Sequence, residues 1–154
     1  MKLRILTISN KPSPWSTQGV DHFMTKFPKG FRPEIIELAP NKGFGNMQKK
    51  LLKEKDRLKS RIDPSSWLVI LDEAGATCTS AELSKKLDLW ILDGGRVDMI
   101  IGGAEGLHES LKAEADEMIS LSKLTLPHQI ARLVLIEALY RASTILINHP
   151  YHRA

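Results

Sequence analysis

The chain has a single cysteine, Cys78, among its 154 residues. One cysteine excludes an intrachain disulfide framework and a cysteine-based metal cluster. No apolar stretch reaches the ~18 residues that a membrane-spanning helix needs, and the amino terminus, MKLRILTIS, has no cleavage site of a signal peptide. With 42% apolar and 26% charged residues, the composition is that of an ordinary globular protein. We therefore expect one cytoplasmic domain over residues 1–154, without membrane contact.

Several familiar catalytic motifs are missing as well. The sequence has no nucleophile elbow, no HExxH zinc motif, no EF-hand loop and no DxD-like metal site. It also lacks a Gly-Lys-Ser/Thr phosphate loop, and its glycine-rich segment IIGGAEGL does not fit the GxGxxG dinucleotide pattern. Hydrolysis and phosphoryl transfer therefore lack their usual parts, and we expect no bound metal.

Positive charge is in mild excess, with 22 Lys and Arg against 18 Asp and Glu and a net charge of +4. The segment from 42 to 61 concentrates it, because it contains eight basic residues and two acidic ones. Such a segment is compatible with a solvated helix face and, equally, with an anionic partner such as RNA.

Short β-rich runs alternate with helical patterns along the whole chain. This alternation predicts an α/β fold with a largely parallel sheet. The third strand, WLVIL, is a continuous apolar run, as expected of a strand buried on both faces. Ser80 is the predicted N-cap of the helix that ends before Gly94. Strands are predicted at 3–8, 34–38, 67–71, 97–101 and 118–121, and the other helices at 15–26, 46–61, 108–114 and 127–147.

The last of these helices is apolar over more than one stripe. A helix that packs only on its own sheet needs an apolar face of about 100°. The surplus predicts a second apolar neighbour, most simply another copy of the chain in a homodimer. The alternative is a helix enclosed by its own domain.

Two segments after predicted strands are candidate ligand loops. IIGGAEGL, residues 100–107, allows a backbone turn to approach a ligand closely, and the carboxyl ends of parallel strands are where ligands bind. LSKLTLP, residues 121–127, offers backbone amides and carbonyls to a flat ring such as adenine. Read alone, the first segment is equally a structural turn, and the second more often a connecting loop.

The tail INHPYHRA, residues 147–154, is richer in reactive groups than an ordinary polar end. Its two histidines have no neighbouring carboxylate or cysteine, so they make a poor metal site. Histidine is suited to moving a proton near neutral pH, and arginine to holding phosphate. We therefore expect the tail to act in the chemistry.

Taken together, LDEAG, IIGGAEG, LSKLTLPH, LxxEALYRA and NHPYHR, in this order and spacing, resemble the ribosomal RNA large subunit methyltransferase H family. The resemblance covers essentially the whole chain. It implies a SPOUT-class fold with a carboxyl-terminal trefoil knot, a homodimer, and S-adenosylmethionine as the cofactor. The implied activity is methylation of N3 of a pseudouridine in 23S rRNA, in the assembled 70S ribosome.

The resemblance also places the cofactor site residue by residue. It falls on Leu71 and Gly103 and on the loop before the last helix, while Gly102 and Gly106 shape the glycine turn. The residues expected from that loop are Ser122, Lys123, Leu124, Thr125, Leu126 and Pro127. These are neutral, apart from Lys123, and suit a cofactor that arrives already activated by its sulfonium charge.

The remaining work is alignment of the methyl acceptor and removal of its imide proton. His152 is the predicted base and His149 the second candidate. Arg153 and Arg141 are expected to bind phosphate or to stabilise negative charge on the base's carbonyls, and Tyr151 to stack on the base. The alternatives are a catalytically inactive RNA-binding or ribosome-binding module of the same fold, and a nucleotide-dependent enzyme that holds phosphate in the glycine loop.

Overall fold

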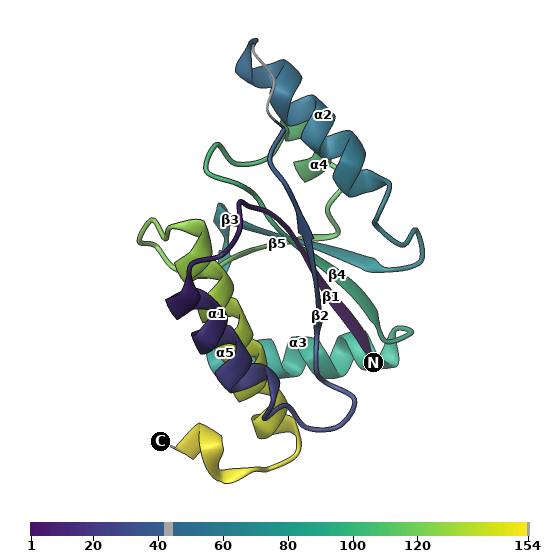
Figure 1. Ribbon diagram of the computed structural model, residues 1–154. Coiled ribbons are helices and arrows are strands. Elements are labelled where there is room, and N and C mark those ends of the chain that lie inside the picture. Colours follow the sequence, from purple (N-terminus) through teal and green to yellow (C-terminus); the bar gives the residue numbers. More distant parts are fainter. Residues whose placement is uncertain (42–44, 154) are drawn as a thin grey trace.

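The computed structural model describes residues 1–41 and 45–153, with only the backbone of residues 152 and 153. Lys42, the first residue of the basic segment, lies outside this part. Figure 1 shows a central sheet with helices on both faces. The elements are β1 (Lys2–Ile8), α1 (Pro14–Met24), β2 (Glu34–Leu38), α2 (Met47–Lys59), β3 (Trp67–Thr77), α3 (Ser80–Leu92), β4 (Arg96–Ile101), α4 (Glu109–Lys112), β5 (Glu117–Ser120), α5 (His128–Leu146) and the 3₁₀ helix η1 (Pro150–Arg153).

The five strands form one sheet in the order β2-β1-β4-β3-β5. All four neighbouring pairs are parallel, so the carboxyl ends of the strands meet at one edge of the sheet. β1 and β4 lie inside the sheet, and all their residues are buried except Lys2, Arg4 and Arg96, as expected of strands covered on both faces. The predicted α/β fold with a parallel sheet is confirmed. The trefoil knot stays a prediction.

Two hydrophobic cores separate the helices into layers. One core, with Ile5, Val69 and Met99 of the sheet, packs against α1, α3 and α5. The other, with Leu6, Ile70 and Ile100, packs against Leu58 of α2 and Leu111 of α4. Successive residues of β1, β3 and β4 therefore alternate between the two cores, as the pleat of a strand requires.

The long helix α5 packs against α1 and α3 as well as the sheet. Leu135, Ile136 and Leu139 are fully buried there, so neighbours within the chain use much of the apolar surface that the sequence shows. Ile147, just after the helix, remains 49% exposed. The homodimer stays a prediction. The apolar surface of α5 no longer argues for it, and the remaining argument comes from the arrangement of the functional residues described below. None of the described helices is long and apolar enough to cross a bilayer.

All the predicted elements are present, and their ends, apart from the end of β3, lie within two residues of the predicted ones. Three details differ from the prediction in an informative way. The N-cap of α3 is Thr79, not Ser80, because the Thr79 hydroxyl accepts from the Glu82 amide and the Glu82 carboxylate accepts from the Thr79 amide. β3 continues from Leu71 to Thr77, beyond its apolar part. The last helix begins at His128 with Pro127 as its N-cap.

Candidate functional site

A cavity of about 540 Å³ lies beside β3, where β4 and β5 end. We call it the main cavity. Its walls come from the glycine segment after β4, the loop between β5 and α5, the start of α5 and the middle of β3. Its volume is in the range of roughly 300–1,000 Å³ that small-molecule sites occupy. All the residues predicted to bind the cofactor line it, except Lys123, whose side chain is exposed outside.

The glycine segment makes a tight turn that other residues would disturb. The Gly106 amide donates to the Gly103 carbonyl at 3.0 Å, and Gly106 has φ +80°, a left-handed conformation that favours glycine. A Cβ on Gly102 would lie 2.9 Å from Leu107 Cγ. A Cβ on Gly106 would meet nothing within 4 Å, so the constraint there is conformational.

The loop from β5 to α5 is shaped by its own serines. Ser120 Oγ donates to the Ser122 carbonyl at 2.8 Å, and Ser122 Oγ accepts from the Leu124 amide at 2.9 Å. Leu124 is 74% exposed although it lines the cavity. Ser120 and Ser122 thus fix a turn that places Leu124 and Leu126 on the wall of the main cavity.

A bulge in β3 adds the carboxylates of Asp72 and Glu73, which were not among the site residues predicted from the sequence. Register with β5 shifts between Leu71 and Ala76, so the intervening residues protrude. Gly75 makes this possible, because a Cβ there would lie 2.7 Å from the Ile119 amide nitrogen. The bulge brings Asp72 and Glu73 to the wall of the main cavity. Two acids directly after a buried strand were the signal that could have identified them.

Asp72 and Glu73 differ in their surroundings. Asp72 Oδ1 accepts from the Ala74 amide at 2.9 Å, and its Oδ2 lies 3.0 Å from Lys112 Nζ on α4. Burial raises the pKa of Asp72, but the Ala74 amide and Lys112 outweigh it, and the net pKa lies below its ordinary value. Glu73 is exposed. No Lys or Arg is present among the described residues that line the main cavity.

The tail is folded back on α5, and Tyr151 does not line the main cavity. Tyr151 Oη donates to Glu137 Oε1 at 3.1 Å, and Arg141 donates to the same oxygen at 2.7 and 2.9 Å. The Arg141 guanidinium lies 4.8 Å from the centre of the Tyr151 ring, which also packs on Tyr140. Burial and the Glu137 charge raise the pKa of Tyr151. Arg141 is therefore engaged with a carboxylate of its own helix.

The other tail residues are placed less fully. His149 is exposed, and its Nδ1 accepts from the Tyr151 amide at 3.3 Å. The side chains of His152 and Arg153 lie outside the described residues. Glu137, which anchors the tail, follows Ala131, the residue of α5 on the cavity wall that is nearest to it in sequence, by six residues, a rise of roughly 9 Å. Arg141, His149 and Tyr151 do not line the main cavity, so the structure does not bring these three predicted catalytic residues to the predicted cofactor residues within one chain.

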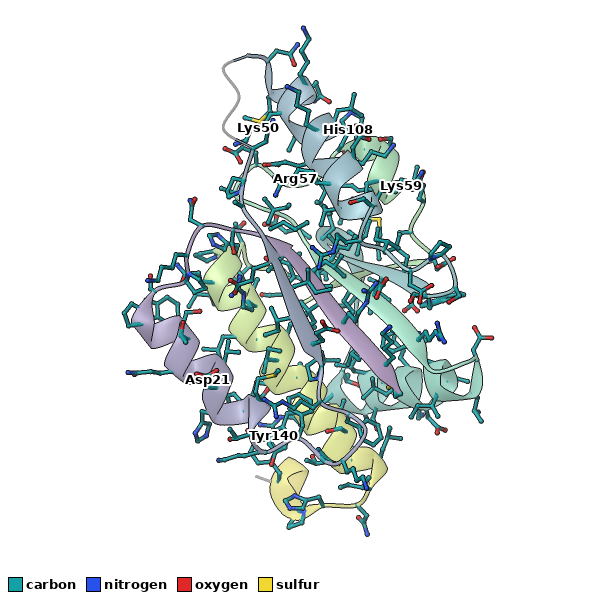
Figure 2. All side chains as sticks on the ribbon, turned by 45° about the vertical axis from the view of Figure 1, so that its right-hand side comes forward. Asp21, Lys50, Arg57, Lys59, His108 and Tyr140 are labelled. Carbon is teal, nitrogen blue, oxygen red and sulfur yellow. The ribbon has the colours of Figure 1, made fainter. Side chains whose placement is uncertain are left out.

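The basic helix α2 lies on the opposite layer, over the sheet end near the glycine segment. Lys50 Nζ lies 3.2 Å from Glu105 Oε1, Lys59 pairs with Glu114, and Arg57 donates to the Ala39 carbonyl. Lys49 and Lys53 are exposed. Figure 2 shows Lys50, Arg57 and Lys59 on this helix at the opposite end of the molecule from Tyr140.

Comparison with known proteins assigns the chain to a family. A family model described as predicted SPOUT methyltransferase matches residues 1–152. A protein of Dechloromonas aromatica named ribosomal RNA large subunit methyltransferase H is 40% identical over 154 residues, covering 99% of both chains. A protein of the same name from Nitrosomonas eutropha is 41% identical over 155 residues and covers all of both chains.

Proposed function

The chain belongs to the SPOUT methyltransferase family, and we propose that it methylates ribosomal RNA of the large subunit, with S-adenosylmethionine as methyl donor. Its relatives carry that RNA in their names. The finer assignment is N3 of a pseudouridine in 23S rRNA of the assembled 70S ribosome, which places the protein in the cytoplasm. The observation that carries the proposal is the main cavity, which unites three sequence segments expected to hold this cofactor.

The residues of the main cavity fit S-adenosylmethionine. When bound, it supplies a methyl group on a positively charged sulfur. The cavity wall offers the backbone of the loop from Ser122 to Pro127 for an adenine ring, and glycines at 102, 103 and 106 for close approach. Lys112 pairs with Asp72, but Glu73 is exposed on the wall and no lysine or arginine is among the described lining residues, which suits a cationic ligand and opposes a phosphate. This charge argues against a nucleotide-dependent enzyme.

We further propose that the active site is completed by a second copy of the chain. The tail anchor at Glu137 is separated from the cavity wall at Ala131 by roughly 9 Å of helix, and neither Tyr151 nor His149 lines the cavity. A catalytic base must come within hydrogen-bond reach of the proton that it removes. A homodimer in which one tail faces the partner's main cavity meets this requirement without unfolding the contacts of Tyr151.

In such a site the tail residues divide the work. Glu137 and Arg141 hold Tyr151 and thereby position the two residues that follow it. His152 accepts the imide proton of the target base, with His149 as the second candidate. Arg153 binds phosphate or stabilises negative charge on the base's carbonyls. Arg141, paired with Glu137, acts through the tail rather than on the RNA.

The RNA contact is proposed to extend to α2. Lys49 and Lys53 are exposed on this helix, whereas Lys50 and Arg57 are engaged within the chain. Exposed lysines are the groups that displace counterions from a phosphate backbone.

The test is methylation with isotope-labelled S-adenosylmethionine of unmodified 70S ribosomes and of free rRNA, followed by mapping of the labelled nucleoside. We expect label in 23S rRNA of the ribosomes and little in free rRNA. A protein that binds ribosomes but transfers no label to either substrate would instead be an inactive RNA-binding module.

A further inference from the structure

The bulge of β3 places one exposed carboxylate at the wall of the main cavity. Glu73 lies in the protruding part between Leu71 and Ala76, and Gly75 packs so closely on β5 that no side chain fits there. The backbone therefore fixes where Glu73 stands. Its neighbour Asp72 is engaged by Lys112 and by the Ala74 amide, so the negative charge of Asp72 is largely compensated.

The main cavity consequently carries an excess negative charge. Among the described residues that line it, the ionisable groups are Asp72, Glu73 and His128. Lys112 on α4 forms ion pairs with both Asp72, at 3.0 Å, and Glu109, at 3.4 Å. The Glu73 carboxylate is therefore the negative charge that is available to interact with a positively charged ligand.

The proposed reaction changes the charge of the ligand in this cavity. The methyl donor has a sulfonium, and the product S-adenosylhomocysteine has a neutral thioether, because the electron pair of the broken carbon–sulfur bond stays on sulfur. The acceptor nitrogen gains the methyl group and loses its proton to a base. Apart from this methyl group and its charge, the two ligands are alike. A fixed negative charge in the cavity therefore makes their binding free energies differ by the Coulomb interaction with one positive charge.

We propose that Glu73 is a charge-selecting residue, which strengthens binding of the cationic methyl donor and leaves binding of the neutral product nearly unchanged. This inference rests on the proposed function, because it takes the main cavity as the methyl-donor site. It goes beyond that function by assigning ligand discrimination to one side chain.

The test compares two ligands on three proteins by calorimetry: the wild type, Glu73→Gln and Asp88→Asn. Asp88 is exposed on α3 and does not line the cavity, so Asp88→Asn is the control for loss of one surface charge. We expect Glu73→Gln to weaken S-adenosylmethionine about threefold to tenfold and to change S-adenosylhomocysteine less than about twofold. Sinefungin, which has a protonated amine in place of the sulfonium, should follow the methyl donor.

In the wild type, the ratio of the affinity for S-adenosylmethionine to that for S-adenosylhomocysteine should fall at high salt, because salt screens the charge of Glu73. In Glu73→Gln this ratio should not change with salt. Equal weakening of both ligands by Glu73→Gln, or no weakening, would overturn charge selection while leaving the methyl-donor site intact. A wild type that binds neither ligand would overturn the proposed function itself. Unfolding temperatures of the three proteins confirm that the comparison concerns folded protein.

Discussion

Lys50 Nζ lies 3.2 Å from Glu105 Oε1, and this ion pair joins the basic helix α2 to the glycine segment of the main cavity. The two side chains are 21% and 37% exposed. Glu105 stands between the tight turn at Gly103 and the left-handed Gly106, so the pair restrains the part of the cavity wall that has no regular secondary structure.

Lys50→Glu should loosen this wall. Half-exposed pairs stabilise a fold by at most about 1 kcal/mol, so we expect a small fall in unfolding free energy. The larger effect should be on S-adenosylmethionine, with an affinity about two- to threefold weaker by calorimetry, because the free loop must be ordered on binding. The double variant Lys50→Glu with Glu105→Lys restores an opposite-charge pair and should recover the affinity. A double variant as weak as the single one would show that the pair does not hold the loop.

Mixing two inactive variants tests whether the tail serves the partner's cavity. One variant lacks Tyr151–Ala154. The other has Gly106→Val, which forces a β-branched residue into a left-handed conformation. If the tail acts in trans, a mixed dimer has one complete site and ribosome methylation should return, to about a quarter of the wild-type rate per chain for random mixing. If the tail acts in its own chain, the mixture stays as inactive as each variant alone.

Lys49→Glu and Lys53→Glu should weaken ribosome methylation at physiological salt without changing the affinity for S-adenosylmethionine. Each lysine that contacts phosphate should lower the slope of log affinity against log salt by about one. Lys55→Glu, on the same helix but less exposed, is the matched control and should have a smaller effect. An unchanged slope in both test variants would leave α2 as a solvated face.

Arg132 and Glu37 form an asymmetric ion pair between α5 and β2. The Arg132 side chain is 3% exposed and the Glu37 side chain 43% exposed, and Arg132 also donates to Ser9 Oγ at 2.8 Å. Glu37→Gln leaves a buried cation without its anion, whereas Arg132→Met leaves an exposed anion. We therefore expect Glu37→Gln to lower the free energy of unfolding by roughly 2 kcal/mol and Arg132→Met by roughly 1 kcal/mol. Denaturant unfolding measures both, and the reverse order would contradict the argument.

Asp63 should make stability depend on pH at the acid end. Ser65 Oγ and the Ser65 amide donate to its carboxylate, and Arg96 lies 3.1 Å away, which lowers the pKa of Asp63 from 3.8 to about 2. Because the folded pKa lies below the unfolded one, the carboxylate stabilises the fold fully above about pH 4 and loses this effect as pH falls through about 2.

Unfolding of the wild type and of Asp63→Asn, followed from pH 2 to 7, checks this. The difference between their free energies of unfolding should be constant at high pH and should decrease toward pH 2. Ser65→Ala removes one donor and should shift the loss toward higher pH. A difference that stays constant down to pH 2 would show that Asp63 is not held by these donors.

The local features of this chain could be predicted from its sequence. The apolar runs locate all five strands, because short apolar runs of strand length between helical patterns and turn residues are typical of a parallel sheet. The glycines of IIGGAEGL and the serines of LSKLTLP shape their own turns through contacts within a few residues, and both loops were assigned to the ligand site. The predicted N-cap of α3, Ser80, was wrong by one residue. Thr79 and Ser80 can both cap a helix, and Thr79 is the cap because Glu82 lies three residues after it and completes the capping box.

What the tertiary structure decided are the relationships between distant residues. The bulge that brings Glu73 to the cavity depends on how Gly75 packs against Ile119 of another strand. Lys50 meets Glu105 across the layers of the fold, and Tyr151 is turned back to Glu137 rather than toward the cavity. Patterns of period and composition record which face of an element is buried, but the partner on that face is chosen by packing of the whole chain, and no local pattern encodes it.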